Sequence, residues 1–272
     1  MKEVQNAAEQ SATENQSILL IGPVGQGKTT LYRTLPGRKF VYCFDPNAKN
    51  ALRGSKDIDF VEFTPDVSDV DIAVKTLKAK TFDSSSAKER KEPTTYTDWE
   101  ADWEERYATG FFEKYDWIIF DSLTTLSEII MDRVQHLNMR LGKQPEQADW
   151  AAEMNTMKSI VRAAMSVGNV VCVAHTETDK DELTGAIHGK LVLTGKGRLR
   201  VPLRFSHIIG CKTDRNSKGE QQYFSKTTQD RMWPAVRTSI EELKGEVDVT
   251  IDFNKPLEGQ GLGRFFTRRH AA

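Results

Sequence analysis

A glycine-rich turn between a short apolar run and a helical stretch constrains this chain more than any other feature. The turn follows the pattern GxxxxGK[ST] at Gly22, Gly27, Lys28 and Thr29. Residues 17–21 before it are typical of a buried strand, and a helix is expected over residues 28–35, where Pro36 and Gly37 stop it. Glycines let backbone N–H groups curve around an anion, and a helix N-terminus adds its positive dipole end. We therefore expect a fold built around a phosphate site at the end of a buried strand.

The same turn predicts individual roles for its residues. The pattern is the Walker A motif, or P-loop, whose lysine contacts the β- and γ-phosphates and whose threonine hydroxyl binds Mg²⁺. We therefore expect ATP and magnesium as cofactors, with Lys28 on the phosphates and Thr29 on the metal. The residues expected to bind the nucleotide are Gly22, Pro23, Gly25, Gln26, Gly27, Lys28, Thr29 and Thr30.

A second apolar run, at residues 115–122, ends in an acid that can complete the metal site. Its sequence, YDWIIFDS, places Asp121 at the end of a buried strand, which is the Walker B pattern. A carboxylate there would hold the magnesium shell together with Thr29. Ser122 is expected to cap the following helix and to take no part in the chemistry.

Hydrolysis of ATP also needs a group that positions or deprotonates water. No glutamate follows Asp121, so Asp45, at the end of the second strand, is the leading acid. His175 closes an apolar run at the edge where such sheets bind ligands, and is expected either to sense the γ-phosphate or to be structural. Asn47 is a further polar candidate, and Thr176 replaces His175 if the register shifts by one residue. The predicted catalytic residues are Lys28, Asp45, Asp121 and His175.

Apolar runs alternate with helical stretches along the rest of the chain. Strands are expected at residues 39–44, 58–63, 116–120 and 169–174, then as a pair at 205–212 and 221–227, with a last one at 247–253. Helices are expected at residues 70–77, 122–141 and 147–167, and a long loop at 176–194. This alternation predicts an α/β fold with a mainly parallel sheet, helices on both faces and a C-terminal β-hairpin.

Composition divides the chain into one large domain with two polar ends. Residues 1–16 are expected to form a disordered arm and residues 254–272 a flexible basic tail. The domain between them, residues 17–253, has an insertion at about residues 80–114. Its second half is acidic and carries aromatic residues at four-residue spacing, which predicts a helix that packs this stripe on the core; a partner-binding helix is the alternative. The stripe comprises Trp99, Trp103, Tyr107 and Phe111.

The overall charge excludes a globally basic protein. The net charge is −1 and the isoelectric point about 6.5, so any nucleic-acid binding has to come from a local patch. No apolar run approaches the ~20 residues that span a bilayer, and the N-terminus has no apolar stretch of a signal peptide. We therefore expect a cytoplasmic protein without membrane contact. The three cysteines, Cys43, Cys172 and Cys211, lie far apart and are expected to be buried and reduced.

The order of these motifs resembles the RecA-like ATPase core. The segment IIFDSLTTL at residues 118–126 is similar to the Asp-Ser signature of RecA and related recombinases. Residues 21–54 resemble phage AAA-type ATP-binding proteins, a group that includes single-strand annealing proteins. The resemblance covers about residues 17–240. It implies a RecA-like P-loop core and ATP-dependent binding of single-stranded DNA in phage recombination or annealing, in the host cytoplasm.

The resemblance also carries two implications about turnover and assembly. RecA-like enzymes place a catalytic glutamate two residues after the acid that ends the second strand, but this chain has Asn47 there, which implies slow hydrolysis. Their strand-end sensor falls on His175 or Thr176. Such sites are commonly completed by a basic residue of the next subunit, which implies a homo-oligomeric ring or filament. The candidates are Lys226, Arg231 and Arg237, each of which is equally well a surface charge.

Local charge indicates where DNA would bind. The two loops that face DNA in RecA-like proteins correspond to residues 141–149 and 176–194, and neither contains an aromatic residue for base stacking. Residues 186–218 contain eight Lys or Arg and one Asp, a local charge of about +7. We expect Lys196, Arg198 and Arg200 to contact the phosphates of single-stranded DNA. The alternatives are a solvated basic edge and a contact to a neighbouring subunit's nucleotide.

Other functions stay open beside this leading interpretation. A nucleotide-gated scaffold that binds ATP, hydrolyses it poorly and has no direct DNA role is favoured by Asn47. A small-molecule kinase would need an arginine-rich lid, of which the sequence gives no sign. A helicase or packaging motor would usually carry a glutamate beside Asp121.

Overall fold

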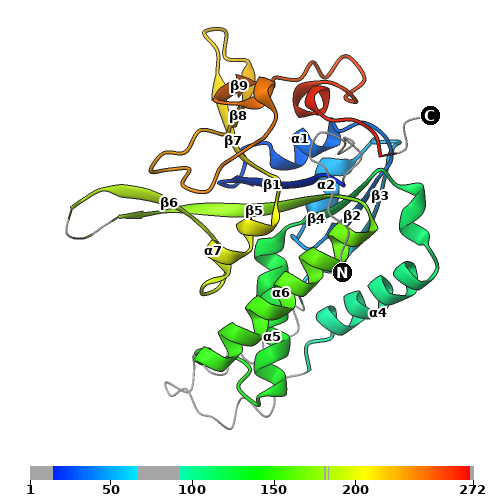
Figure 1. The fold of residues 1–272 in the computed structure, drawn as a ribbon, viewed down its shortest axis with the longest axis vertical. Coiled ribbons are helices and arrows are strands. Elements are labelled where there is room, and N and C mark those ends of the chain that lie inside the picture. Colours follow the sequence, from blue (N-terminus) through cyan, green and yellow to red (C-terminus); the bar gives the residue numbers. More distant parts are fainter. Residues whose placement is uncertain (1–14, 66–91, 181, 183, 270–272) are drawn as a thin grey trace, which may run out of the picture.

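A nine-stranded sheet runs through the middle of the molecule in the computed structural model, which describes residues 15–65, 92–180, 182 and 184–269 (Figure 1). The strands are β1 Ser17–Gly22, β2 Lys39–Cys43, β3 Ile58–Glu62, β4 Trp117–Asp121, β5 Asn169–Lys180, β6 Ile187–Leu191, β7 His207–Arg215, β8 Gln221–Lys226 and β9 Glu246–Asp248. Their order across the sheet is β3-β2-β4-β5-β1-β7-β8-β9, and β6 pairs with β5 outside this path.

Most of this sheet is parallel. The pairs from β3 through β2, β4, β5 and β1 to β7 are parallel, whereas β8 and β9 are antiparallel. The carboxyl ends of β1, β2, β4 and β5 consequently meet at one edge of the sheet. That edge is where open α/β sheets bind their ligands.

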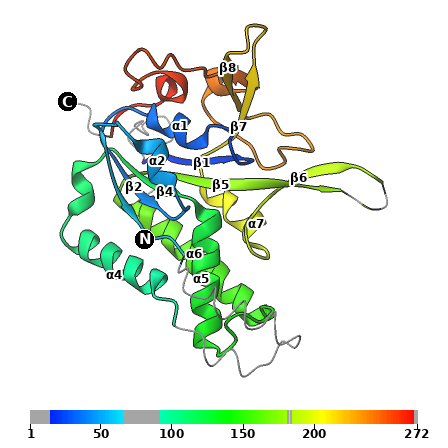
Figure 2. The ribbon, with the colours of Figure 1, turned by 180° about the vertical axis from the view of Figure 1, so that it is seen from behind.

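Helices cover both faces of the sheet, as Figures 1 and 2 show from opposite sides. The α-helices are α1 Lys28–Arg33, α2 Ala48–Leu52, α4 Thr95–Ala108, α5 Leu123–Leu137, α6 Gln147–Val167 and α7 Gly197–Arg200. Short 3-10 helices are η3 Phe111–Lys114, η4 Pro202–Arg204, η5 Glu241–Leu243 and η6 Gly261–Phe265. Helices α4, α5 and α6 lie on one face, and α1, α2 and the C-terminal segment lie on the other.

The alternation of side chains along each strand explains the two layers. In β1, Leu19 and Ile21 join the apolar cluster under α5 and α6, whereas Ile18 and Leu20 join the one under α1. Both sets are at most 2% exposed, which accounts for the continuous apolar run in the sequence. The predicted fold class is therefore confirmed: α/β, with a mainly parallel sheet, helices on both faces and a C-terminal hairpin.

The aromatic stripe packs on the core along most of its length. Trp99 is 3% exposed, and Trp103 and Phe111 pack against the same cluster, with Trp103 and Phe112 ring centroids 4.8 Å apart. Tyr107 departs from the prediction, because it is 55% exposed. The helix ends at Ala108, and a left-handed Gly110 turns the chain before Phe111, so the fourth aromatic reaches the core from η3.

The long loop expected at residues 176–194 is wrong. Strand β5 continues to Lys180, and β6 pairs with it in antiparallel register from Thr176 opposite Leu191 to Lys180 opposite Ile187. This hairpin projects beyond the rest of the sheet in both ribbon views. Its outer residues are exposed on both faces, so it has no apolar alternation by which sequence reasoning could recognise it.

The flexible tail expected from residue 254 is also wrong for the described residues up to 269. Leu262 is fully buried and Phe266 is 5% exposed, both in the apolar cluster that contains α1. The backbone N–H of Gly263 donates to Thr34 Oγ1 (2.9 Å) at the end of α1, and an added Cβ on Gly263 would lie 1.8 Å from Thr34 O. Buried apolar side chains and a close backbone approach thus dock a segment of otherwise polar composition.

Several predictions fall at the margins of the described structure. The N-terminal arm up to residue 14 and the helix at residues 70–77 lie outside the described residues. Gln16 already belongs to the fold, because its carbonyl accepts a hydrogen bond from Val170 N (2.8 Å) beside β1. The three cysteines are buried and free, as predicted.

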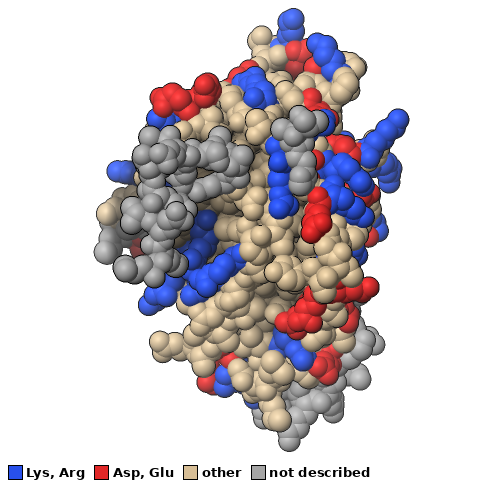
Figure 3. Space-filling view, turned by 45° about the vertical axis from the view of Figure 1, so that its right-hand side comes forward, with Lys and Arg blue, Asp and Glu red and all other residues tan. Residues whose placement is uncertain are grey.

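Charge and polarity vary from place to place on the surface. Figure 3 shows basic and acidic side chains in separate small groups on the face that it presents, with much uncharged surface between them. None of the helices in the described part of the chain combines the length and the apolar character that crossing a bilayer requires.

Candidate functional site

The P-loop sits between β1 and α1 in a conformation that only glycine adopts readily. Gly25 and Gly27 have φ values of 81° and 74°. A Cβ at Gly27 would lie 2.5 Å from the ring of Tyr223, so the hairpin β7–β8 packs directly under the loop. The hairpin also binds the loop through Gln26, whose side-chain oxygen accepts the Thr213 N–H (2.7 Å). The side chain of Gln26, a predicted nucleotide-binding residue, is thus used in a structural hydrogen bond. Its backbone N–H stays available for the phosphates.

Lys28 is buried at the mouth of this loop. Its Nζ donates to the carbonyl oxygens of Gly22 and Pro23, each at 2.7 Å. Burial lowers the pKa of Lys28, while Cys211, Asp121 and Asp45 act in the opposite direction. A phosphate anion would satisfy this ammonium group better than two carbonyls do, since charge-assisted bonds are the stronger ones.

Asp121 lies where a metal ion beside Thr29 would bind. Its Oδ2 accepts hydrogen bonds from Thr29 Oγ1 (2.9 Å) and from the buried Tyr32 hydroxyl (3.0 Å). Burial, reinforced by Asp45, raises the pKa of Asp121 to about 6. Tyr32 was not among the predicted site residues, although its position four residues after Lys28 on the same helix places it on the same face.

These residues fit magnesium and ATP phosphates. The donors beside the loop are a hydroxyl and a carboxylate, and oxygen ligands are what Mg²⁺ prefers. The buried Asp121 carboxylate has a raised pKa that a divalent cation would offset. Thr29 and Asp121 would hold the metal, which would neutralise phosphate charge. No cluster of three or more His, Cys, Asp or Glu side chains offers an alternative metal site within the described residues.

A second group of hydrogen bonds surrounds Asp45 at the end of β2. Its Oδ2 lies 3.0 Å from His175 Nε2, and its Oδ1 accepts bonds from the hydroxyls of Ser122 (2.6 Å) and Thr125. Burial alone would raise the pKa of Asp45, but these hydrogen bonds outweigh it and hold the pKa below its ordinary value. Asp45 is therefore an anchored anion, and Ser122 also caps α5 through Thr125 N, as predicted.

His175 connects this group to the hairpin β5–β6. Its backbone N–H donates to Thr124 Oγ1 on α5 (3.0 Å), and its carbonyl accepts from Val192 N after β6 (2.9 Å). Its ring atom Nδ1 is buried without a hydrogen-bond partner among the described residues. His175 thus touches the strand end, α5 and the segment after the hairpin at once.

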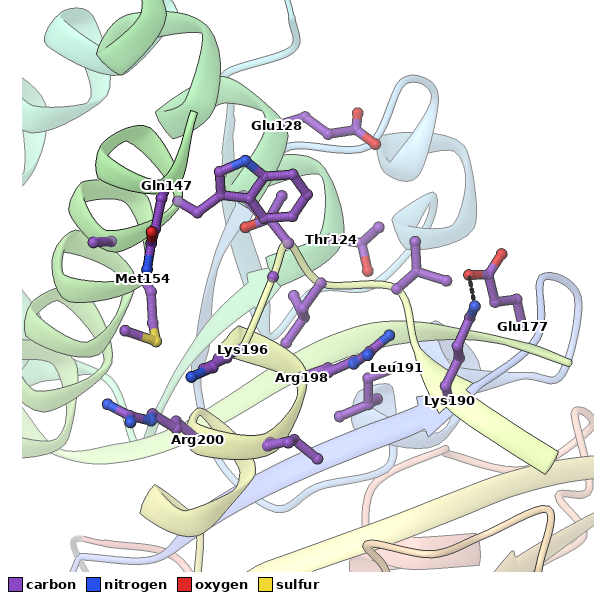
Figure 4. Close-up of a pocket in the computed structure, with 18 residues that line it drawn as sticks. Thr124, Glu128, Gln147, Met154, Glu177, Lys190, Leu191, Lys196, Arg198 and Arg200 are labelled. Atoms are coloured by element: carbon purple, nitrogen blue, oxygen red, sulfur yellow. Dashed lines mark hydrogen bonds and ion pairs between the residues drawn. The ribbon is translucent and has the colours of Figure 1, made fainter. Parts of the chain in front are cut away.

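A large pocket opens on the far side of this histidine, with a volume of about 1010 Å³. Residues of α5, α6, the hairpin and α7 line it, among them Thr124, Glu128, Gln147 and Met154 (Figure 4). Thr124 belongs both to the pocket wall and to the His175 contact. The pocket and the predicted ATP site therefore share α5 and the end of β5.

The three predicted DNA-binding residues line this pocket together. Lys196, Arg198 and Arg200 are exposed, come from the segment that forms α7, and make no hydrogen bond or ion pair through their side chains with other described residues. Lys190 is different, because it pairs with Glu177 (3.5 Å) and Asp179 (3.0 Å). Elsewhere in the basic stretch, Lys212 pairs with Glu246. Three exposed cations without an ion pair therefore lie together at the pocket.

Two pocket residues escaped sequence reasoning. Trp150 is 37% exposed and lies in the first turn of α6, directly after the loop that was predicted to lack aromatics. Glu128 lies one turn after Thr124 on α5; partial burial and Asp45 raise its pKa, and His175 opposes the shift. The spacing of Thr124 and Glu128 on one helix face was the available signal.

Three basic residues were predicted to complete the nucleotide site of a neighbouring subunit. Two of them have partners within their own chain. Lys226 pairs with Asp230 at 2.8 Å. Arg237 donates from Nη2 to the carbonyl oxygen of Phe205 (2.7 Å) and stabilises the turn before β7. Arg231 is exposed and its side chain makes no hydrogen bond or ion pair with the residues described. It is therefore the candidate best able to reach another molecule.

Comparison with known proteins places the chain in a family. No curated protein matches the chain. Among solved structures, a KaiC-like protein from the hyperthermophilic archaeon Pyrococcus horikoshii is similar at 13% identity and a TM-score of 0.39, over 86% of this chain and 89% of that one. The model of the family described as AAA domain matches residues 14–237. Family and P-loop together make this an ATP-binding P-loop protein. Since the match spans well over half of the sequence, the chain belongs to the AAA domain family.

Proposed function

We propose that this protein is a magnesium-dependent ATPase that binds single-stranded DNA in the pocket beside α7, as a recombination or annealing protein of phage type would. The observation that carries the proposal is the arrangement of Lys196, Arg198 and Arg200. These three cations without ion pairs line one pocket of a protein whose net charge is −1. Backbone phosphates are the ligands that such a group suits, because binding them needs charge and no base recognition.

The link to ATP runs through His175. The γ-phosphate of ATP at the P-loop would compete with Asp45 for His175, whose Nε2 lies 3.0 Å from Asp45 Oδ2. Any movement of His175 acts on Val192, the residue that leads from β6 into the pocket wall. Nucleotide state and DNA affinity would thus be coupled through one strand end.

Glu128 supplies the acid that position 47 lacks. Asn47 stands at the start of α2 in a left-handed conformation with φ of 66°. Glu128 lines the pocket, interacts electrostatically with both Asp45 and His175, and has a raised pKa suited to a general base. We assign to it the activation of water, with Asp45 and His175 holding the surrounding groups in place.

The first test is DNA binding over a salt series, by fluorescence anisotropy of a labelled oligonucleotide. Replacing Lys196, Arg198 and Arg200 together by Ala should weaken binding and leave ATP affinity unchanged. If phosphate contacts dominate, affinity falls by about 0.7 log units per contact for each tenfold rise in salt, so the variant's slope should be lower by about 2.

A matched control replaces three exposed cations outside the pocket, Arg53, Lys56 and Arg162. This control changes the net charge equally and should keep the wild-type slope. Absence of DNA binding by the wild type at low salt would reject the DNA role, as would equal slopes for both triple variants.

A second candidate, a nucleotide-gated scaffold without a DNA role, is favoured by Asn47 and by the full engagement of Asp45. If no other acid replaces the glutamate missing at position 47, hydrolysis would be slow and ATP would act as a bound ligand. Turnover measured with and without single-stranded DNA separates the two, because only the first function predicts stimulation by DNA.

We further propose that the active form is a homo-oligomer, a ring or filament. The support is that Arg231 is exposed and has no ion pair with a described residue, while Lys226 and Arg237 are engaged within the chain. Arg231 would then reach the nucleotide of the next subunit.

A further inference from the structure

The pocket beside α7 contains more than positive charge. Apolar side chains, including Met154, Leu193 and Leu199, form part of its lining together with the indole of Trp150. Phosphate contacts alone do not call for an apolar cavity of about 1010 Å³. We propose that one base of the bound strand enters this pocket and stacks on Trp150; the inference rests on the proposed DNA function.

The indole of Trp150 is held in place before any ligand arrives. Its Nε1 donates to the carbonyl oxygen of Pro145 (3.0 Å). Its carbon edge packs on the backbone of Gly195, where an added Cβ would lie 2.6 Å from Cε3. With two anchors and 37% of its surface exposed, the ring is a preorganised platform that loses little side-chain freedom on binding.

The turn at Thr194 and Gly195, on which the indole packs, is itself held by hydrogen bonds. Ser127 donates to the buried Glu153 (2.7 Å) and shares a hydrogen bond with Thr194 (3.1 Å), the residue before Gly195. Glu153 is 2% exposed, so this network lies inside the protein and joins α5, α6 and the turn. The position of Gly195 against the indole is therefore determined by the core.

The charges lie where a stacked nucleotide would need them. Lys196 follows Gly195 directly, and Arg198 and Arg200 continue along the same short segment around the pocket (Figure 4). A base on Trp150 would bring its own phosphate to this segment. Stacking accepts any base, because each has a π-face, so the site is expected to tolerate all sequences.

The experiment compares two oligonucleotides that differ only in their bases. One is an ordinary mixed-sequence single strand, and the other carries abasic residues at successive positions. Wild type should bind the abasic strand about tenfold more weakly at the same salt concentration. Trp150→Leu should bind the ordinary strand about tenfold more weakly than wild type does, and should bind the abasic strand as wild type does. Trp150→Phe should retain most of the affinity for the ordinary strand.

Controls separate this inference from the proposed function. Tyr107→Leu removes an exposed aromatic on α4, outside the pocket, and should bind both strands like wild type. A mononucleotide at equal concentration should compete weakly; strong competition would assign the pocket to a free nucleotide instead. Equal wild-type affinity for both strands would overturn stacking and leave phosphate binding intact. The same conclusion would follow if Trp150→Leu and removal of the bases each weakened binding and their effects added. Failure of wild type to bind either strand would reject the DNA function itself. The wild-type comparison decides the question even if Trp150→Leu does not fold.

Discussion

The phosphate loop occupies eight consecutive positions, Gly22–Thr29, whereas the pocket beside α7 gathers residues from Thr124 to Arg200 across five elements. The loop is specified by local geometry, since glycine φ values and one helix start define it. The pocket exists only after α5, α6 and the hairpin have packed. A short pattern can therefore specify the first region, and only tertiary structure specifies the second.

The two regions also differ in how their charges are balanced. At the loop, Lys28, Asp121 and Asp45 are within electrostatic range of one another in a buried setting. At the pocket, Lys196, Arg198 and Arg200 are exposed and make no ion pair with another described residue. Substitutions should consequently separate nucleotide binding from DNA binding, and three variants sharpen that comparison.

The largest effect is expected for Lys28→Ala. The buried ammonium supplies the charge-assisted bonds to the phosphates, so ATP affinity should fall by about 100-fold, measured by calorimetry or with a fluorescent nucleotide. DNA binding without nucleotide should be unchanged, because Lys28 is not part of the pocket. Lys49→Ala, at an exposed cation paired with Glu62, is the control and should bind ATP normally. A folded Lys28→Ala protein with wild-type ATP affinity would contradict the assigned role.

A smaller effect is expected for Glu128→Gln, in turnover alone. Loss of a general base should reduce kcat by about 10- to 100-fold while ATP affinity stays the same. Because the pKa of Glu128 is raised, wild-type turnover should fall as the pH drops through that pKa, and this limb should be absent from the variant. Glu177→Gln removes another pocket carboxylate, one paired with Lys190, and should keep both rate and profile. Unchanged kcat in Glu128→Gln would return the role of base to Asp45.

The smallest effect is expected for Asp121→Asn, as a gain in stability. Burial, reinforced by Asp45, raises the pKa of this carboxyl from 3.8 to about 6, so the folded protein holds the proton more tightly than the unfolded chain does. The stabilising contribution is complete below about pH 4 and is lost as the pH rises through about 6. Asn accepts the same two hydrogen bonds without charge. The nucleotide-free variant should therefore gain about 1–3 kcal/mol at about pH 7.5 and little at about pH 4.

Urea unfolding at the two pH values measures this gain. ATP binding with and without Mg²⁺ measures the second expected effect, which is the loss of magnesium dependence. Glu104→Gln, at an exposed position in the middle of α4, is the control, with no expected change in either. A variant less stable than wild type at neutral pH would contradict the raised pKa of Asp121, and one with normal magnesium dependence would move the metal to another acid.

Much of the fold could be predicted because its central strands are buried on both faces. Continuous apolar runs located β1, β2 and β4 to within one residue at each end. The outer half of β5 was missed because Glu177 to Lys180 face solvent on both sides and have no apolar partner. Docking of the C-terminal segment was missed because its few apolar residues, with Leu262 and Phe266 the most deeply buried, are spread through a stretch of glycine and arginine.

The candidate site divides in the same way. The loop conformation and the place of Asp121 beside Thr29 could be predicted, since both follow from position relative to one strand and one helix. Tyr32 and Glu128 were missed although helical spacing places each near another site residue, because their interactions with Asp121 and with Asp45 form only in the fold. Trp150 lies one residue beyond the expected DNA-facing loop at residues 141–149, and only the fold brings its indole against Gly195.

The contact between Thr34 and the C-terminal segment has a practical consequence for truncation of this chain. A boundary placed at Asn254, where composition alone ends the domain, would strip Leu262 and Phe266 from the apolar cluster that contains Leu31 and Tyr32 of α1. Those residues belong to the helix whose first turn is expected to bind the phosphates. Nucleotide affinity and attachment of the far end of the polypeptide are thereby thermodynamically linked, although no phosphate comes near that end. A shortened protein that binds ATP weakly would then reveal a loosened helix and say nothing against the P-loop.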